Sequence, residues 1–327
     1  MSQSGRRRPL EQQIAELDTL RADPNSAQTR AALSRALESS RSPLVAAAAE
    51  LIAELELDGF EPALSAAFER WIEQPAKADA NCMAKTSAVR ALYRLGAKTH
   101  GVYLRGIRHR EGGPHASDPA APLRGLCALA LVRSGYFDAL VEAAELLADR
   151  EPQVRAAAAQ AIAYSERQDV GVPLLRLKAR LGDEEPQVIA ACLFGLLSLA
   201  PAGSLEFVAN MVQSGAPEFR EAALLALGES RVVGALPILQ RAAEDPLASE
   251  QRGIAFIAIA LLRSDAAWDY LLRVVAEDPI GKASEALSAL ATYRSDENLS
   301  RRALDAVRER GERSLLTQAM RAFQRDA

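Results

Sequence analysis

The chain has 327 residues, of which 49% are hydrophobic and only 5% aromatic, and its formal net charge at pH 7 is −4. The apolar content is sufficient for a core, and the scarcity of aromatic residues favours helices packed through alanine and leucine over a β-sandwich. The acidic balance argues against a general binder of nucleic acids or anionic membranes.

The N-terminal residues predict a short disordered basic tail over residues 1–8, which includes Arg6, Arg7 and Arg8. These arginines do not precede an apolar segment, and the chain holds no apolar run near the ~20 residues that a membrane span requires. We therefore expect a cytoplasmic protein without a membrane segment.

Residues 9–40 predict an N-terminal cap made of two helices, over residues 10–20 and 27–39, whose outer faces are polar. A polar outer face is what the first layer of a stacked array requires, because one side of that layer meets water. The first full hairpin then follows over residues 43–57 and 60–73, with Gly59 as the break between its helices.

A helical pattern recurs from residue 44 to residue 290. In each copy the residues four and seven positions after the start are mostly alanine, glycine or cysteine, and the residue eight positions after it is leucine or isoleucine. This spacing places the three side chains on one helix face, where small residues allow close helix packing. Cysteines 127 and 192 occupy the first of these positions, so we expect them to be small buried core residues rather than disulfide partners. The starting residues are 44, 84, 123, 154, 188, 219, 251 and 282.

Each of these helices is followed by a second apolar helix, for example over residues 139–147 and 205–212. The pattern predicts about eight helical hairpins over residues 43–310, followed by a C-terminal cap over residues 313–325. We therefore expect residues 9–327 to form a single all-α solenoid.

The segment Pro152-Gln153-Val154-Arg155-Ala156-Ala157-Ala158, with Asp149 before it, resembles HEAT repeats, and within them the short form named after the lyases that attach bilins to phycobiliproteins. Partial copies occur over residues 183–192 and 217–223. The resemblance implies a right-handed α-solenoid of stacked hairpins, and it leaves the function open because such repeats serve unrelated tasks.

A basic residue follows the starting position in several repeats. The pattern could form a basic ladder, but we expect each side chain to pair with a loop aspartate (Asp118, Asp149 or Asp245), because arginine and aspartate belong to the repeat signature itself. The basic residues are Lys85, Arg124, Arg155, Arg220 and Arg252.

The segment from residue 77 to residue 118 differs from the rest of the array, because its loops are longer than the repeat requires. All three histidines lie in it, and residues 77–124 hold nine basic and three acidic side chains, a net charge of +6. Long loops on a rigid scaffold often carry function. We therefore predict that an acidic protein partner contacts this segment, with Tyr103 as an apolar anchor. The other predicted contacts are Arg105, Arg108, His109, Arg110 and His115.

The same segment suggests a metal site, with Glu111 and Asp118 as further ligands. The spacing of His100, His109 and His115 fits no single helix face, and no cysteine pair accompanies them, so we expect no metal and no cofactor. The chain also holds no His-Glu dipeptide, which excludes the HEAT-like iron hydroxylases.

These observations favour a non-enzymatic scaffold or adaptor that binds another protein through its concave face, which we expect the second helices to form, and through the 77–118 segment. The alternatives are a bilin lyase-like enzyme or chaperone, by analogy of fold, and a HEAT-like nucleic-acid-binding protein. Acidic side chains between Arg108 and Arg176 interrupt any basic track, so nucleic acid is the less favoured partner. The oligomeric state stays open.

Overall fold

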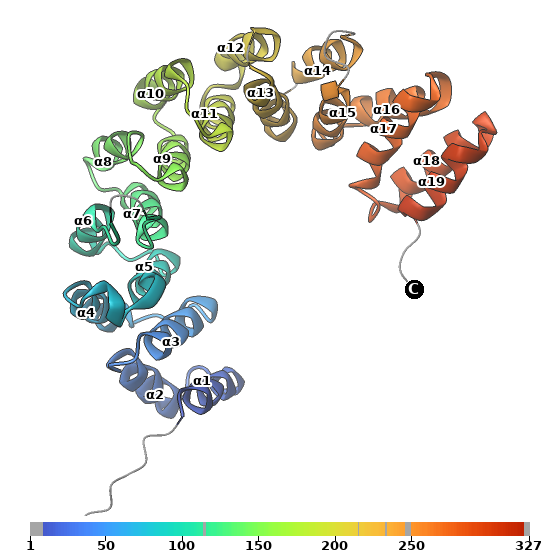
Figure 1. Ribbon diagram of the computed structural model, residues 1–327. Coiled ribbons are helices and arrows are strands. Elements are labelled where there is room, and N and C mark those ends of the chain that lie inside the picture. The colour runs from blue at the N-terminus through green and yellow to red at the C-terminus, as the bar shows by residue number, and fades with distance from the viewer. Residues whose placement is uncertain (1–8, 114–115, 215, 233, 246–249, 324–327) are drawn as a thin grey trace, which may run out of the picture. The chain divides into compact units, whose positions relative to one another are not determined.

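The computed structural model describes residues 9–113, 116–214, 216–232, 234–245 and 250–323, and every element within these ranges is a helix (Figure 1). The prediction of an all-α fold is therefore confirmed. The basic tail predicted over residues 1–8 lies outside the described residues. Among the described helices, none has the length and apolar character that crossing a membrane demands.

The chain divides into two compact units, residues 1–165 and 166–327. In unit one, two α-helices and a 3-10 helix precede the regular array, and two further 3-10 helices lie between α4 and α5. Its elements are α1 (Leu10–Asp18), η1 (Thr19–Ala22), α2 (Ala27–Leu37), α3 (Ser42–Glu54), α4 (Glu61–Ile72), η2 (Ala76–Ala78), η3 (Ala80–Cys82), α5 (Met83–Arg94), α6 (His100–Arg108), α7 (Ala121–Arg133), α8 (Ala139–Leu146) and α9 (Pro152–Tyr164).

Unit two continues the same alternation of helices. The single solenoid that the sequence suggests for residues 9–327 stays a prediction, since each unit is compact by itself. The elements of unit two are α10 (Gln168–Leu181), α11 (Pro186–Leu199), α12 (Pro201–Ser214), α13 (Pro217–Ser230), α14 (Ala235–Glu244), α15 (Arg252–Leu261), α16 (Asp265–Glu277), α17 (Ile280–Ala291), α18 (Glu297–Arg310) and α19 (Arg313–Phe323).

The helices that carry the repeat pattern begin as the sequence suggests. Pro152, Pro186 and Pro217 occupy the first turns of α9, α11 and α13, where a missing N–H leaves no hydrogen bond unmade. The residues four, seven and eight positions after each repeat start are all buried, including Ala158, Cys192 and Ile259. The predicted core register is therefore confirmed.

The hairpins have a different phase from the expected one. We call the helices that carry the repeat pattern (such as α7 and α13) first helices, and the helices between them second helices. Each second helix packs more closely on the first helix that follows it than on the one that precedes it, as α6 does on α7 and α12 does on α13. Each hairpin therefore consists of a second helix, the loop after it and the first helix of the next repeat. Arg124 on α7 binds Asp118 of the loop before that helix, which fixes the turn between α6 and α7.

The first helices also form the inner side of each unit. In unit one α3, α5, α7 and α9 stack directly on one another, and in unit two α11, α13, α15 and α17 do the same, whereas contacts within the other row are mostly slighter (Figure 1). Small residues allow the first helices to approach more closely, and the more closely spaced row of a curved stack lies inside the curve. The expectation that second helices form the concave face is therefore corrected.

Candidate functional site

One of two buried clusters of charge in the described part of unit one lies around Arg124 on α7. Its Nη1 donates to Asp118 Oδ2 at 2.6 Å, and its Nε and Nη2 donate to the two oxygens of Asp149, both at 3.0 Å. At most 3% of each of the three side chains is exposed. Arg124 therefore ties the loop before α7 to the loop before α9.

The protonation states of this group are fixed by its contacts. Burial alone would raise the pKa of Asp118, but the backbone N–H groups of Glu111 and Ala120 and the guanidinium of Arg124 hold it below its usual value. Burial would lower the pKa of Arg124, and its bonds to Asp149 and Asp118 raise it instead. Asp118 and Arg124 are therefore both charged near neutral pH.

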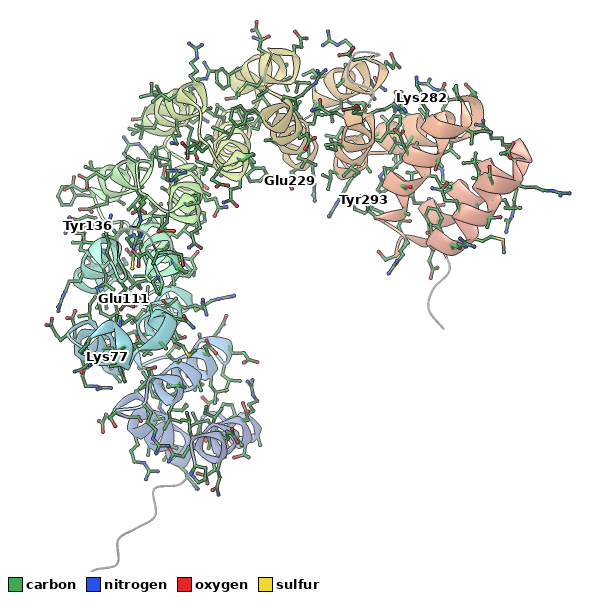
Figure 2. All side chains as sticks on the ribbon, in the orientation of Figure 1. Lys77, Glu111, Tyr136, Glu229, Lys282 and Tyr293 are labelled. Carbon is green, nitrogen blue, oxygen red and sulfur yellow. The ribbon has the colours of Figure 1, made fainter. Side chains whose placement is uncertain are left out.

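One repeat earlier, Lys85 on α5 takes the place of Arg124. Its Nζ lies 3.0 Å from Asp79 Oδ2 and 2.9 Å from Glu111 Oε1, and its side chain has no exposed surface. Burial would lower the pKa of Lys85, and the bonds to Glu111 and Asp79 raise it. His109 Nε2 lies 2.9 Å from the same oxygen of Glu111, which sits among the helices of unit one (Figure 2).

The interpretation of the repeated basic residues as structural partners is confirmed for most of them. Besides Lys85 and Arg124, Arg220 binds Asp245 at 2.8 Å. Arg252 differs, because its partner is Glu285 on α17 rather than a loop aspartate. Arg155 donates to the backbone oxygens of Asp149 and Arg150. Arg124, Arg220 and Arg252 thus connect neighbouring layers, whereas Arg155 holds the loop before its own helix.

Tyr103, one of the predicted partner contacts, does not lie at the surface as expected. Tyr103 is fully buried, and its hydroxyl donates to the backbone oxygen of Ala97 at 2.9 Å, so it cannot anchor a partner at the surface. Burial raises the pKa of this hydroxyl. His115 lies outside the described residues.

The three arginines of the predicted site are exposed but paired. Arg105 binds Glu69 and Glu73 of the α4 region, and Arg108 binds Glu142 of α8. Arg110 donates to Asp149 Oδ2 at 3.0 Å. The acids come from outside residues 77–118, so a count of charges within that segment overstates its positive charge.

A feature of unit two had not been singled out from the sequence. Phe194 on α11, Leu225 on α13 and Ile257 on α15 each lie six residues after a repeat start, on the helix side opposite the core. Phe194 is 39% exposed and Ile257 38%, and Leu225 is half-buried. These helices are neighbours in the inner row (Figure 1), so we call the three residues the inner apolar stripe.

Unit one has no run of apolar residues at this repeat position. The position holds Glu50, Arg90, Leu129 and Gln160 there, so the single leucine stands between two polar side chains. At the end of α13, exposed Glu229 lies on the inner side of unit two (Figure 2) and gives the stripe a polar neighbour. The stripe could have been found by aligning the repeats and comparing their outward-facing residues as well as their core.

Comparison with known proteins identifies the repeat. Residues 172–260, which run from α10 to α15, match the family model of HEAT repeats. No curated protein matches the sequence. The resemblance to HEAT repeats is thus confirmed for these residues.

Several solved structures are similar to the chain. YibA of Escherichia coli shares 18% identity, over 70% of this chain and 98% of that one, with a TM-score of 0.38. An engineered protein shares 15% identity, over 95% and 98% of the two chains, with a TM-score of 0.32. The complex of CpcE and CpcF of phycocyanin lyase from Nostoc shares 17% identity, over 99% and 96%, with a TM-score of 0.27.

Proposed function

We propose that this chain is a non-enzymatic HEAT-repeat protein that binds another protein along the inner row of first helices in unit two. The observation that carries the proposal is the inner apolar stripe of Phe194, Leu225 and Ile257. Three outward-facing apolar side chains at one repeat position on adjacent helices form a continuous surface that another apolar surface can cover.

The spacing of the stripe favours a helical partner. Packed helices lie about 8–10 Å apart, so the three stripe residues repeat at about that distance. Residues seven apart on an α-helix are separated by about 10.5 Å along its axis. An amphipathic helix with apolar residues at positions i, i+7 and i+14 can therefore lie across α11, α13 and α15.

The buried reactive groups support a role without catalysis. Lys85, Arg124 and their acidic partners are engaged in ion pairs. Burial raises the pKa of Cys82 and Cys192 to about 12 and that of Cys127 further, so these thiols are poor nucleophiles at neutral pH. Within the described residues no observation favours a bilin lyase or a nucleic-acid binder over a protein binder.

The 77–118 segment stays a proposed second contact, through Arg105, Arg108 and Arg110. An acidic partner has to displace the glutamate or aspartate that each arginine already binds, so its contribution should be modest and should fall as salt rises. His109 can contribute little to such a contact, because only 17% of its side chain is exposed. The triple variant R105E/R108E/R110E tests this surface by the salt dependence of partner binding.

Affinity purification from the native host tests the main proposal. The double variant Phe194→Asp with Ile257→Asp places charges on the stripe, and the matched control, Arg90→Asp with Gln160→Asp, changes exposed residues at the same repeat position in unit one. We expect the wild type and the control to retain a common partner that the stripe variant loses, with far-ultraviolet circular dichroism confirming that all three are folded. Retention of the same partner by the stripe variant would refute the proposal.

A further inference from the structure

Three side chains with metal-binding chemistry meet beside the start of α5. Cys82 ends η3, and His109 and Glu111 follow α6. The Cys82 sulfur, a ring nitrogen of His109 and a carboxylate oxygen of Glu111 all lie within 4.8 Å of one another. Cys82 is fully buried, and 4% of the Glu111 side chain and 17% of the His109 side chain are exposed.

The repeat itself does not explain two of these residues. The ion pairs of Lys85 with Asp79 and Glu111 correspond to those of Arg124 with Asp118 and Asp149. By the same alignment, the next repeat has Ala121 where this one has Cys82, and Leu147 where it has His109. Both counterparts are buried apolar residues. This repeat thus carries a thiol and an imidazole, both close to Glu111, where the next repeat carries apolar side chains.

The backbone at Cys82 is in an uncommon conformation. Asn81 has φ 58° and ψ 24°, and Cys82 has φ 53° and ψ 34°, so two consecutive non-glycine residues are left-handed. L-residues rarely adopt this conformation, and it persists where surrounding contacts enforce it. Here it coincides with the thiol that lies against His109 and Glu111.

The charge of the cluster also favours a bound cation. The carboxylates of Asp79 and Glu111 and the ammonium of Lys85 together carry a net charge of −1. A divalent cation bound to a Cys82 thiolate brings that sum to zero. A thiolate, an imidazole and a carboxylate are ligands that Zn²⁺ accepts.

We propose that Cys82, His109 and Glu111 bind one zinc ion. The thiol releases its proton to solvent, a sulfur–zinc bond forms and no redox step is involved. The ligand atoms already lie within 4.8 Å of one another, and to form zinc bonds of about 2.0–2.3 Å they must close around the ion, with the 2.9 Å contact between His109 Nε2 and Glu111 Oε1 opening to admit it. Asp79 still holds the Lys85 ammonium when Glu111 turns to the metal. The partial exposure of His109 leaves a solvent route by which the ion can enter.

Titration of the full chain after dialysis against a chelator tests the proposal. Calorimetry with Zn²⁺ should give one bound ion per chain, and Co²⁺ should give a thiolate-to-metal charge-transfer band. Cys82→Ala should lose the band, and His109→Leu should weaken Zn²⁺ binding at least 10-fold. Both substitutions introduce the side chain that the next repeat already carries. Cys192→Ala and His100→Ala are the matched controls and should bind as wild type does.

Two results would overturn the zinc site. One is a wild-type chain that binds neither ion, and the other is a Co²⁺ band that persists in Cys82→Ala. If Cys82→Ala does not fold, His109→Leu decides alone, because unchanged Zn²⁺ affinity in that variant removes the imidazole from the site. None of these outcomes bears on the inner apolar stripe, which lies in unit two.

Discussion

Gly228 on α13 is the position where the close packing of the inner row can be tested most sharply. A Cβ added there would lie 2.4 Å from the carbonyl oxygen of Ala258 on α15, 2.8 Å from its Cα and 2.9 Å from its carbonyl carbon. All three neighbours are backbone atoms, so no side chain can rotate away. The Gly228→Ala variant must therefore move α13 from α15 by about 1 Å to reach ordinary contact distance.

The net effect follows from two opposing terms. Alanine gains about 1 kcal/mol over glycine in a helix interior, while overpacking a core costs about 1–3 kcal/mol. Because the clash is with backbone, we take the cost at the upper end and expect a net loss of about 2 kcal/mol. For a unit of this size that corresponds to a fall in Tm of about 4–8 °C.

Thermal and urea unfolding followed by circular dichroism measures this loss. Gly253→Ala on α15 is the matched control, because a Cβ there meets nothing within 4 Å. It should leave stability unchanged or raise it by up to about 1 kcal/mol. A Gly228→Ala variant at least as stable as the wild type would show that α13 and α15 do not approach as described.

Two further predictions concern the buried ion pairs of unit one. Arg124→Met leaves the Asp118 and Asp149 carboxylates without their buried partner and should cost about 3–5 kcal/mol in urea unfolding; a loss below about 1 kcal/mol would contradict the geometry. Because the pKa of Asp118 is lowered in the folded chain, its stabilising contribution is complete above the unfolded value of about 3.9 and is lost as pH falls through the folded pKa. Asp118→Asn should therefore flatten the acid limb of the stability–pH curve, and an unchanged limb would refute this.

The helices and their core faces could be predicted from the sequence because helical periodicity is local. The small residues at Ala158 and Ala223 mark the core directly, and both are buried. The hairpin phase could not be taken from periodicity, because the pattern does not say which neighbouring helix packs more closely. The six-residue spacing from Asp118 to Arg124 held that information, since it fixes the turn between α6 and α7.

The predicted site was harder to infer, because its contacts join residues one repeat apart. Glu142 and Asp149 lie more than thirty residues after the arginines 108 and 110 that they bind, so a local charge count misses them. Tyr103 was expected at the surface because its helix is rich in basic residues. In the structure its hydroxyl donates to the backbone oxygen of Ala97 inside the fold. Cys82 and His109 meet only through the stacking of α5, α6 and the loop after α6.

Site-specific photo-crosslinking in the native host tests most directly the claim that the inner row binds a protein. A photoreactive phenylalanine analogue at residue 225 replaces the central residue of the inner apolar stripe. The same analogue at residue 177 replaces Leu177 on α10, which is 57% exposed but lies in the second-helix row. We expect a crosslinked partner at residue 225 and none at residue 177. A crosslink at residue 177 alone, or at neither position, would contradict that claim.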